Sequence, residues 1–168
     1  IHVCLVAERQ CQMTIEDYVA GVNSCLGELN ATSVEGVVKA ICAAFQKHKQ
    51  LFICGNGGSA SMSSHFASDL GKGMVGDSQI RLPVLSLADN MDLVTAIAND
   101  ISFAAVFKEQ LVSLLNAGDV VIGISGSGNS PNILEAIEYA KSKGARTIGL
   151  CGFGGGKLAK AADLAIVV

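Results

Sequence analysis

Short apolar runs alternate along the chain with segments whose apolar residues repeat at helical spacing. The runs predict strands near residues 51–54, 83–87, 119–124, 146–151 and 164–168. The helical repeats predict helices near residues 60–72, 91–98, 102–116, 131–143 and 156–161. Repeated alternation of strand and helix is typical of a doubly wound α/β fold, in which a sheet of parallel strands is covered on both faces.

Two further helices are predicted before the first strand, within about the first 50 residues. Apolar positions repeat from about residue 15 to residue 29, and again from Val34 to Phe45, with Thr32 or Ser33 as the expected N-cap of the second helix. Helices that precede an α/β core often pack outside the sheet. We therefore expect their surplus apolar faces to serve in oligomerisation.

The predicted elements form a single domain over residues 1–168, with the N-terminal helices at about 1–50 and the α/β core at 51–168. The last predicted strand is Ala165-Ile166-Val167-Val168. A doubly wound domain normally covers both faces of its sheet, and no segment after this strand does so. We expect a C-terminal helix that is missing from this sequence.

Composition argues against a nucleic-acid-binding protein and against a membrane-spanning protein. The net charge of −3 gives no electrostatic footprint for nucleic acid, and no apolar run approaches the roughly 20 residues that a membrane span needs. Without a secretory leader, the expected location is the cytoplasm. No CxxC pair occurs, so the cysteines are predicted to be reduced structural thiols rather than metal ligands or disulfides. They are Cys4, Cys11, Cys25, Cys42, Cys54 and Cys151.

The strand predicted at Val120–Ile124 leads into a turn of small polar residues, Ser125 to Ser130, and then into Pro131. Proline suits the first position of a helix, because its missing N–H would be unpaired there anyway. Hydroxyls, glycines and the free amides of a helix N-terminus together form a candidate site for a phosphate monoester. The alternative is that the turn only caps the helix, since serine, glycine and asparagine are common in capping turns.

A second strand, Leu51–Cys54, leads into a turn of similar kind, Gly55-Asn56-Gly57-Gly58-Ser59, and then into a predicted helix. In an open parallel α/β sheet, ligands bind at the carboxyl ends of the strands, near the point where the strand order reverses. The two turns are therefore predicted to form opposite walls of one pocket.

Several of these residues carry a resemblance to the sugar isomerase (SIS) domain family, and within it to the phosphoheptose isomerase group. The matching segments are Cys54–Ser59, His65–Ala67, Thr95–Asp100, Gly118–Ser130 and Gly149–Leu150. The resemblance covers roughly residues 15–168. It implies a five-stranded, flavodoxin-like sheet and a homotetramer whose active sites lie at subunit interfaces.

The resemblance also implies roles for individual residues. In that family, the positions of Asn56, Gly57 and Gly58 contact the substrate, and Ser59 lies beside them. The positions of Ser125, Ser127 and Ser130 hold the phosphate, with backbone from Gly126, and the position of Asp89 faces the sugar. His65 matches a metal-ligand histidine in members that bind zinc, so Zn²⁺ is the expected cofactor.

Asp69 departs from the family pattern, in which the position four residues after that histidine is usually glutamate. The family residue acts as a metal ligand or as the base that moves a proton between sugar carbons. The spacing places His65 and Asp69 on one helix face, and aspartate shortens the reach of the carboxylate by one methylene. Further ligands and the general acid lie on the family's last helix. The alternatives are a hydrogen-bonded surface histidine, a solvated acid at Asp69, and helix caps at Asp89 and Asp100.

The implied activity is the conversion of sedoheptulose 7-phosphate to D-glycero-D-manno-heptose 7-phosphate through an enediolate. A sugar phosphate is then the expected partner, with no nucleic acid and no membrane. The alternative is an inactive SIS domain that binds a phosphosugar or another protein, as in regulators that associate with bacterial replication initiators. A third interpretation is a different phosphosugar isomerase or a phosphosugar sensor.

Overall fold

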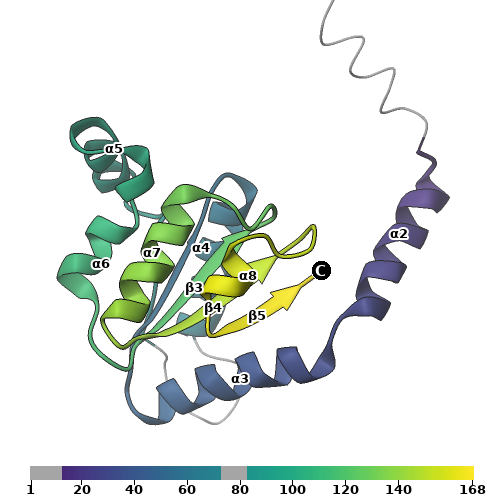
Figure 1. The fold of residues 1–168 in the computed structure, drawn as a ribbon, viewed down its shortest axis with the longest axis horizontal. Coiled ribbons are helices and arrows are strands. Elements are labelled where there is room, and N and C mark those ends of the chain that lie inside the picture. Colours follow the sequence, from purple (N-terminus) through teal and green to yellow (C-terminus); the bar gives the residue numbers. More distant parts are fainter. Residues whose placement is uncertain (1–12, 73–82) are drawn as a thin grey trace, which may run out of the picture.

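Five parallel strands form one sheet, as the apolar runs predict. The computed structural model describes residues 13–72 and 83–168, and the predicted thiols Cys4 and Cys11 lie outside them. The strands are β1 (Leu51–Gly55), β2 (Val84–Ser86), β3 (Val120–Ser125), β4 (Arg146–Cys151) and β5 (Leu164–Val167). Their order across the sheet is β2-β1-β3-β4-β5, and every neighbouring pair is parallel (Figure 1). The prediction of a doubly wound, flavodoxin-like sheet is confirmed.

The helices agree with the predicted segments at most positions. They are α2 (Ile15–Glu28), α3 (Ala31–Gln46), α4 (Gly58–Lys72), α5 (Met91–Asp100), α6 (Lys108–Leu114), α7 (Pro131–Ser142) and α8 (Leu158–Ala161), with a 3₁₀ turn, η1 (Phe103–Ala105). None of the helices in the described ranges has both the length and the apolar character needed to cross a bilayer.

Two local predictions about the helices are wrong. The segment at 102–116 is not one helix. Ser102 caps the turn η1 by accepting a hydrogen bond from Ala105 N at 3.2 Å, and α6 begins separately at Lys108. The N-cap of α3 is neither Thr32 nor Ser33. Asn30 is the cap, and its side chain accepts from Ser33 N at 3.0 Å.

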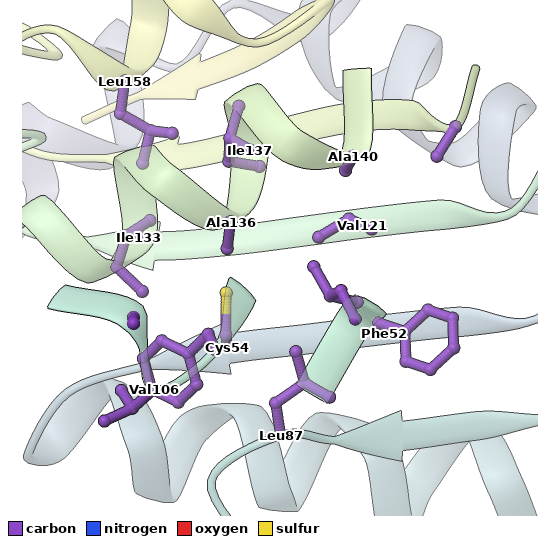
Figure 2. Close-up of a cluster of buried hydrophobic side chains, with 14 of the residues drawn as sticks. Phe52, Cys54, Leu87, Val106, Val121, Ile133, Ala136, Ile137, Ala140 and Leu158 are labelled. Atoms are coloured by element: carbon purple, nitrogen blue, oxygen red, sulfur yellow. The ribbon is translucent and has the colours of Figure 1, made fainter. Parts of the chain in front are cut away.

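Helices cover both faces of the sheet. On one face, α7 packs against β3 and β4, and Figure 2 shows Ile133, Ala136 and Ile137 along the side of α7 that faces the sheet. Helices α5, α6 and α8 and the turn η1 complete this layer, and α3 and α4 cover the opposite face. Because both faces are covered, all residues of β1 and β3 are buried, which explains their continuous apolar runs.

Helix α7 lies close to β3 because Gly123 has no side chain. A Cβ at this position would lie 2.7 Å from Ile133 Cγ2, so a larger residue would push the helix away from the sheet. The start of α7, directly after Ser130, is thus fixed relative to the end of β3.

The strand order reverses between β1 and β3. From β1 the chain passes through α4 to β2 at one edge, and from β3 it passes through α7 to β4 on the other side. Helices α4 and α7 pack on opposite faces, so the segments that follow β1 and β3 diverge. This divergence is the arrangement that forms a ligand crevice in α/β proteins.

Helix α2 extends away from the rest of the structure (Figure 1). A capping box of Thr14 and Asp17 begins the helix. None of its residues is buried, and Ile15 is 80% exposed and Leu26 60% exposed. The predicted apolar face of this helix therefore has no partner within the described part of the chain.

Candidate functional site

The turn between β3 and α7, residues 125–130, is called here the serine turn. Ser125 is buried at the end of β3, and its hydroxyl lies 3.0 Å from the hydroxyl of Ser130. Ser130 is the N-cap residue of α7, but its side chain makes no capping hydrogen bond. The Ser127 side chain is exposed, and its oxygen accepts from Asn129 N at 3.2 Å. The Ser130 hydroxyl thus points to Ser125 rather than capping the helix.

The serine turn is held by a second loop, residues 152–157, called here the β4 loop. Gly152 N of this loop donates to Gly126 O, and Leu158 N, at the start of α8 directly after the loop, donates to Gly128 O, both at 2.9 Å. Gly128 has φ of 63°, and a Cβ there would overlap the Gly155 carbonyl. Two backbone hydrogen bonds and this close approach fix the shape of the turn before any ligand binds.

The side chain of Asn129 adds a further link between the serine turn and the β4 loop. Its Nδ2 donates to Ser127 O at 2.8 Å, and its Oδ1 accepts from Lys157 N at 3.2 Å. Asn129 is therefore a structural residue of the turn, and sequence reasoning did not assign it a role of its own.

Phe153, in the β4 loop, has an unfavourable backbone conformation. Its φ is 47°, a left-handed value that bulky residues rarely adopt, and its side chain is 92% exposed. Because asparagine tolerates this conformation and little buried surface would be lost, we expect Phe153→Asn to raise the free energy of unfolding by about 1 kcal/mol. Urea denaturation measures the change.

The matched control for this prediction is Phe153→Leu, which keeps a large apolar side chain in the same conformation. We expect it to leave the free energy of unfolding nearly unchanged. A lower stability of the asparagine variant would mean that the Phe153 ring contributes contacts that outweigh its backbone strain.

The segment after β1, Asn56 to Gly58, lies at the same edge of the sheet as the serine turn. Gly57 has φ of 55°, α4 begins at Gly58, and Ser59 N donates to Asn56 O at 3.0 Å in the first turn of the helix. Ser59 is half-buried there. The predicted substrate residues of this segment therefore surround the N-terminus of α4, as the serine turn surrounds the N-terminus of α7.

A pair of asparagines joins the two segments. Asn56 Nδ2 donates to Asn132 Oδ1 at 2.9 Å, and Asn132 Nδ2 donates to Asn56 Oδ1 at 2.8 Å. Sequence reasoning missed Asn132, which is 1% exposed. One feature of the sequence could have indicated it. Asn132 is a polar amide residue in the first turn of a predicted helix, between Pro131 and the apolar Ile133.

His65 and Asp69 lie on one face of α4, as their spacing predicts. His65 Nε2 is 3.0 Å from Asp69 Oδ2, and Lys72 Nζ is 2.9 Å from Asp69 Oδ1. The hydrogen bond from Lys72 is the largest influence on Asp69 and lowers the pKa of its carboxyl, with smaller contributions from His65. Asp69 is therefore a carboxylate at neutral pH.

The same face of α4 borders an open pocket of about 450 Å³. Ser61, Met62, His65, Phe66 and Asp69 line it. At 1.5 Å per residue, His65 lies about 10 Å and Asp69 about 16 Å along the axis from Gly58, where the helix starts. The histidine and the carboxylate are thus displaced along α4 from the end at which the serine turn lies.

Asp89, after β2, contacts α4 as well. Its Oδ1 accepts a hydrogen bond from the hydroxyl of Ser64, the residue before His65. The capping role considered for Asp89 and Asp100 is wrong. Asn90 caps α5 by accepting from Leu93 N at 3.0 Å, and Asp100 is the last residue of that helix.

The residues described here do not form a complete zinc site. His65 Nε2 and Asp69 Oδ2 are suitable donor atoms, but no group of three or more histidine, cysteine, aspartate or glutamate side chains gathers in the described ranges. Zinc takes at least three protein ligands even in catalytic sites. His65 and Asp69 would supply two.

The two buried cysteines near the sheet, Cys54 and Cys151, are not suited to act as nucleophiles. Burial raises the pKa of the Cys54 thiol to about 12, and it also raises the pKa of Cys151, so both are poor nucleophiles. Cys25 and Cys42 are free and exposed, whereas Cys54 and Cys151 are free and buried.

A family model and two curated relatives match most of the chain. Residues 17–152 match the SIS domain. A probable phosphoheptose isomerase of Thermoplasma volcanium is 37% identical over 156 residues, which are 93% of this chain and 79% of the relative. A phosphoheptose isomerase of Geobacter sulfurreducens is 38% identical over 167 residues, 98% of this chain and 80% of the relative.

Two solved structures share the fold. The phosphoheptose isomerase GmhA of Neisseria gonorrhoeae superposes with a TM-score of 0.78 at 31% identity, over 92% of this chain and 84% of that one. A phosphoheptose isomerase of Francisella tularensis gives a TM-score of 0.85 at 26% identity, over 96% and 85% of the two chains.

Proposed function

Because the chain belongs to the SIS domain family, and within it to the phosphoheptose isomerases, we propose that it converts sedoheptulose 7-phosphate to D-glycero-D-manno-heptose 7-phosphate. It is an isomerase of phosphosugars. The observation that best supports the heptose is the distance along α4 from the helix start, which lies at the same edge of the sheet as the serine turn, to the acid–histidine pair.

The length of the substrate matches this separation. In sedoheptulose 7-phosphate the phosphate is on C7, whereas the isomerisation takes place at C1 and C2. Seven or eight bonds separate the phosphorus from these carbons, and at about 1.2 Å per bond the extended chain spans roughly 8 to 10 Å. His65 lies about 10 Å along α4 from the helix start. A phosphate held at the serine turn would place the reacting carbons near His65 and within reach of Asp69.

The chemistry requires one proton to move between adjacent carbons. In this proposal, the serine turn holds the phosphate and Asn56 contacts the sugar. As the base, Asp69 takes the proton from C1 of the ketose to give the enediolate and returns it to C2. The proton of the C1 hydroxyl passes to the C2 oxygen, so that C1 becomes the aldehyde and C2 carries a hydroxyl. His65 donates a hydrogen bond to the oxygens that gain negative charge.

Asp69 and His65 have a second possible assignment, as two ligands of Zn²⁺. The metal would polarise the sugar oxygens at C1 and C2. Further ligands would have to come from residues that the structure does not describe or from another subunit. Measurement of bound zinc in the wild type and in His65→Ala tests this assignment without an activity assay, because loss of one of few ligands should abolish stoichiometric binding.

The direct experiment is turnover of the purified protein. Sedoheptulose 7-phosphate is supplied with and without added zinc, and the aldose product is followed by chromatography. Product formation is expected, and His65→Ala should reduce it. No turnover under either condition would contradict the isomerase proposal and favour the alternative of an inactive phosphosugar-binding protein.

One observation favours that alternative. Lys72 engages the Asp69 carboxylate and lowers its pKa, which makes Asp69 a weaker base than a group that titrates near neutral pH. An inactive binding protein would still bind the sugar phosphate. Calorimetric titration with sedoheptulose 7-phosphate beside the turnover assay separates binding without turnover from the absence of both.

The proposal includes assembly into a homotetramer with active sites at subunit interfaces, in the cytoplasm. The apolar face of α2 supports the assembly, since no residue of this helix is buried. The open pocket along α4 also leaves room for a wall from another subunit. The four free thiols of the described residues suit a reducing compartment.

Charged substitutions on the apolar face of α2 should prevent this assembly. We expect Val22→Glu together with Leu26→Glu to convert the tetramer into smaller species, because both side chains are exposed and apolar. Light scattering after size exclusion measures the mass. The control, Asn23→Glu with Gly27→Glu, adds the same charges one position further round the helix and should leave the tetramer intact. A monomeric wild type would contradict the proposal.

A further inference from the structure

We infer that Asn132 is a positioning residue of this site, whose side chain holds the amide of Asn56 in the orientation in which Asn56 contacts the sugar. The inference rests on the proposed function, because it takes from that function the contact between Asn56 and the substrate. The pair of hydrogen bonds between the two amides carries the argument.

The two hydrogen bonds close a ring between the amides, at 2.9 and 2.8 Å. A primary amide has two N–H donors and two lone pairs on its oxygen. The ring uses one donor and one lone pair from each residue. Asn56 therefore keeps one N–H and one lone pair free, and together these match a sugar hydroxyl, which both accepts and donates.

Asn132 is suited to hold Asn56 and unsuited to touch the substrate itself. It is 1% exposed and lies in the first turn of α7, beside the core residue Ile133 and two positions after Ser130. Asn56 is half-buried and precedes two exposed glycines, Gly57 and Gly58. Asn132 is thus held by the helix, whereas Asn56 comes from a more exposed, glycine-rich segment.

The pair also connects the two walls of the crevice. Asn56 follows β1 and Asn132 follows β3, 76 residues later in the chain. The serine turn ends at Ser130, so the contact fixes the distance between the phosphate-holding wall and the sugar-contacting wall. A small change in this distance should strongly reduce the rate of isomerisation, because the base and the reacting carbons must lie within a narrow range of distances.

A double-mutant cycle on kcat/KM tests this role. We expect Asn132→Ala and Asn56→Ala each to lower kcat/KM for sedoheptulose 7-phosphate by about 10- to 100-fold. The double variant should be no worse than Asn56→Ala alone, because Asn132 acts only through Asn56. Affinity for inorganic phosphate, measured by calorimetry, should stay within about twofold of the wild type, since the serine turn is unchanged.

The matched control is Thr147→Val, near the amino end of β4 and thus at the end of the sheet opposite the site. Thr147 is fully buried, and its hydroxyl donates to Asp163 Oδ2 at 2.9 Å and accepts from Asp163 N at 3.0 Å. The substitution removes two part-buried hydrogen bonds, as Asn132→Ala does. It should lower the unfolding temperature without changing kcat/KM, which separates positioning from general loss of stability.

The outcomes separate this inference from the proposed function. Additive losses in the cycle, or an unchanged kcat/KM in Asn132→Ala, overturn the role of Asn132 while wild-type turnover upholds the function. If Asn132→Ala does not fold, Asn132→Ser takes its place in the cycle. If the wild type binds the heptose phosphate without turnover, the same cycle is measured on its affinity. Absence of both turnover and binding in the wild type overturns the function and this inference together.

Discussion

Replacing Ser127 and Ser130 together with alanine is expected to abolish the stabilisation of the protein by sedoheptulose 7-phosphate. Each hydroxyl that donates to a charged phosphate contributes about 1.5 to 3 kcal/mol, so the double variant should bind at least 100-fold more weakly. A ligand stabilises only the state that it binds, and the shift in unfolding temperature should disappear. Differential scanning fluorimetry with increasing sugar phosphate measures the effect.

The unliganded protein should tolerate this change. Ser127 is exposed, and the Ser130 side chain does not cap α7, so neither hydroxyl is needed for the helix to form. The control is Ser142→Ala, which removes an exposed hydroxyl at the other end of α7 and should keep the full shift. An undiminished shift in the double variant would show that the phosphate binds elsewhere.

Asp69→Asn is expected to lower kcat by about 100-fold or more, with little change in KM. The substitution keeps the size of the side chain and removes its charge, while the serine turn that binds the phosphate is unchanged. Steady-state kinetics on sedoheptulose 7-phosphate measure both constants. Glu35→Gln is the control. Glu35 is also an exposed acidic residue on a helix, and it forms an ion pair with Lys39, four residues later. Wild-type kcat in Asp69→Asn would contradict a catalytic role.

The pH dependence provides a second test of Asp69. Its pKa is lowered below the usual 3.8 by Lys72, so the active carboxylate is present above that pKa and is lost only as the pH falls through it. Between about pH 5 and pH 8, kcat should therefore show no acid limb from Asp69. Lys72→Gln should raise the pKa and move that limb upward, and an unmoved limb would mean that Lys72 does not control this carboxylate.

The strands and the positions of both turns were predictable because burial on two faces forces continuous apolar runs. The runs at β1 and β3 end in glycine and serine, and parallel pairing brings these ends to one edge of the sheet. The i,i+4 pair on α4 was predictable for a similar reason, since helical geometry alone brings His65 and Asp69 together.

The contacts between distant segments were not predictable. Asn132 is one asparagine in a first helical turn, and no periodicity indicates that its partner lies 76 residues earlier. Helical spacing also joined residues 102–116 into one helix, because Val106, Phe107 and Leu111 suit a helix face. The structure divides that segment into η1, capped by Ser102, and α6, and neither the cap nor the division changes the spacing of the apolar residues.

The free apolar face of α2 has a consequence for how the stability of this protein depends on its concentration. If that face is buried only between subunits, association contributes to the free energy of unfolding by mass action, and the unfolding temperature should rise as the protein becomes more concentrated. Dilution would then weaken the fold and the active site together.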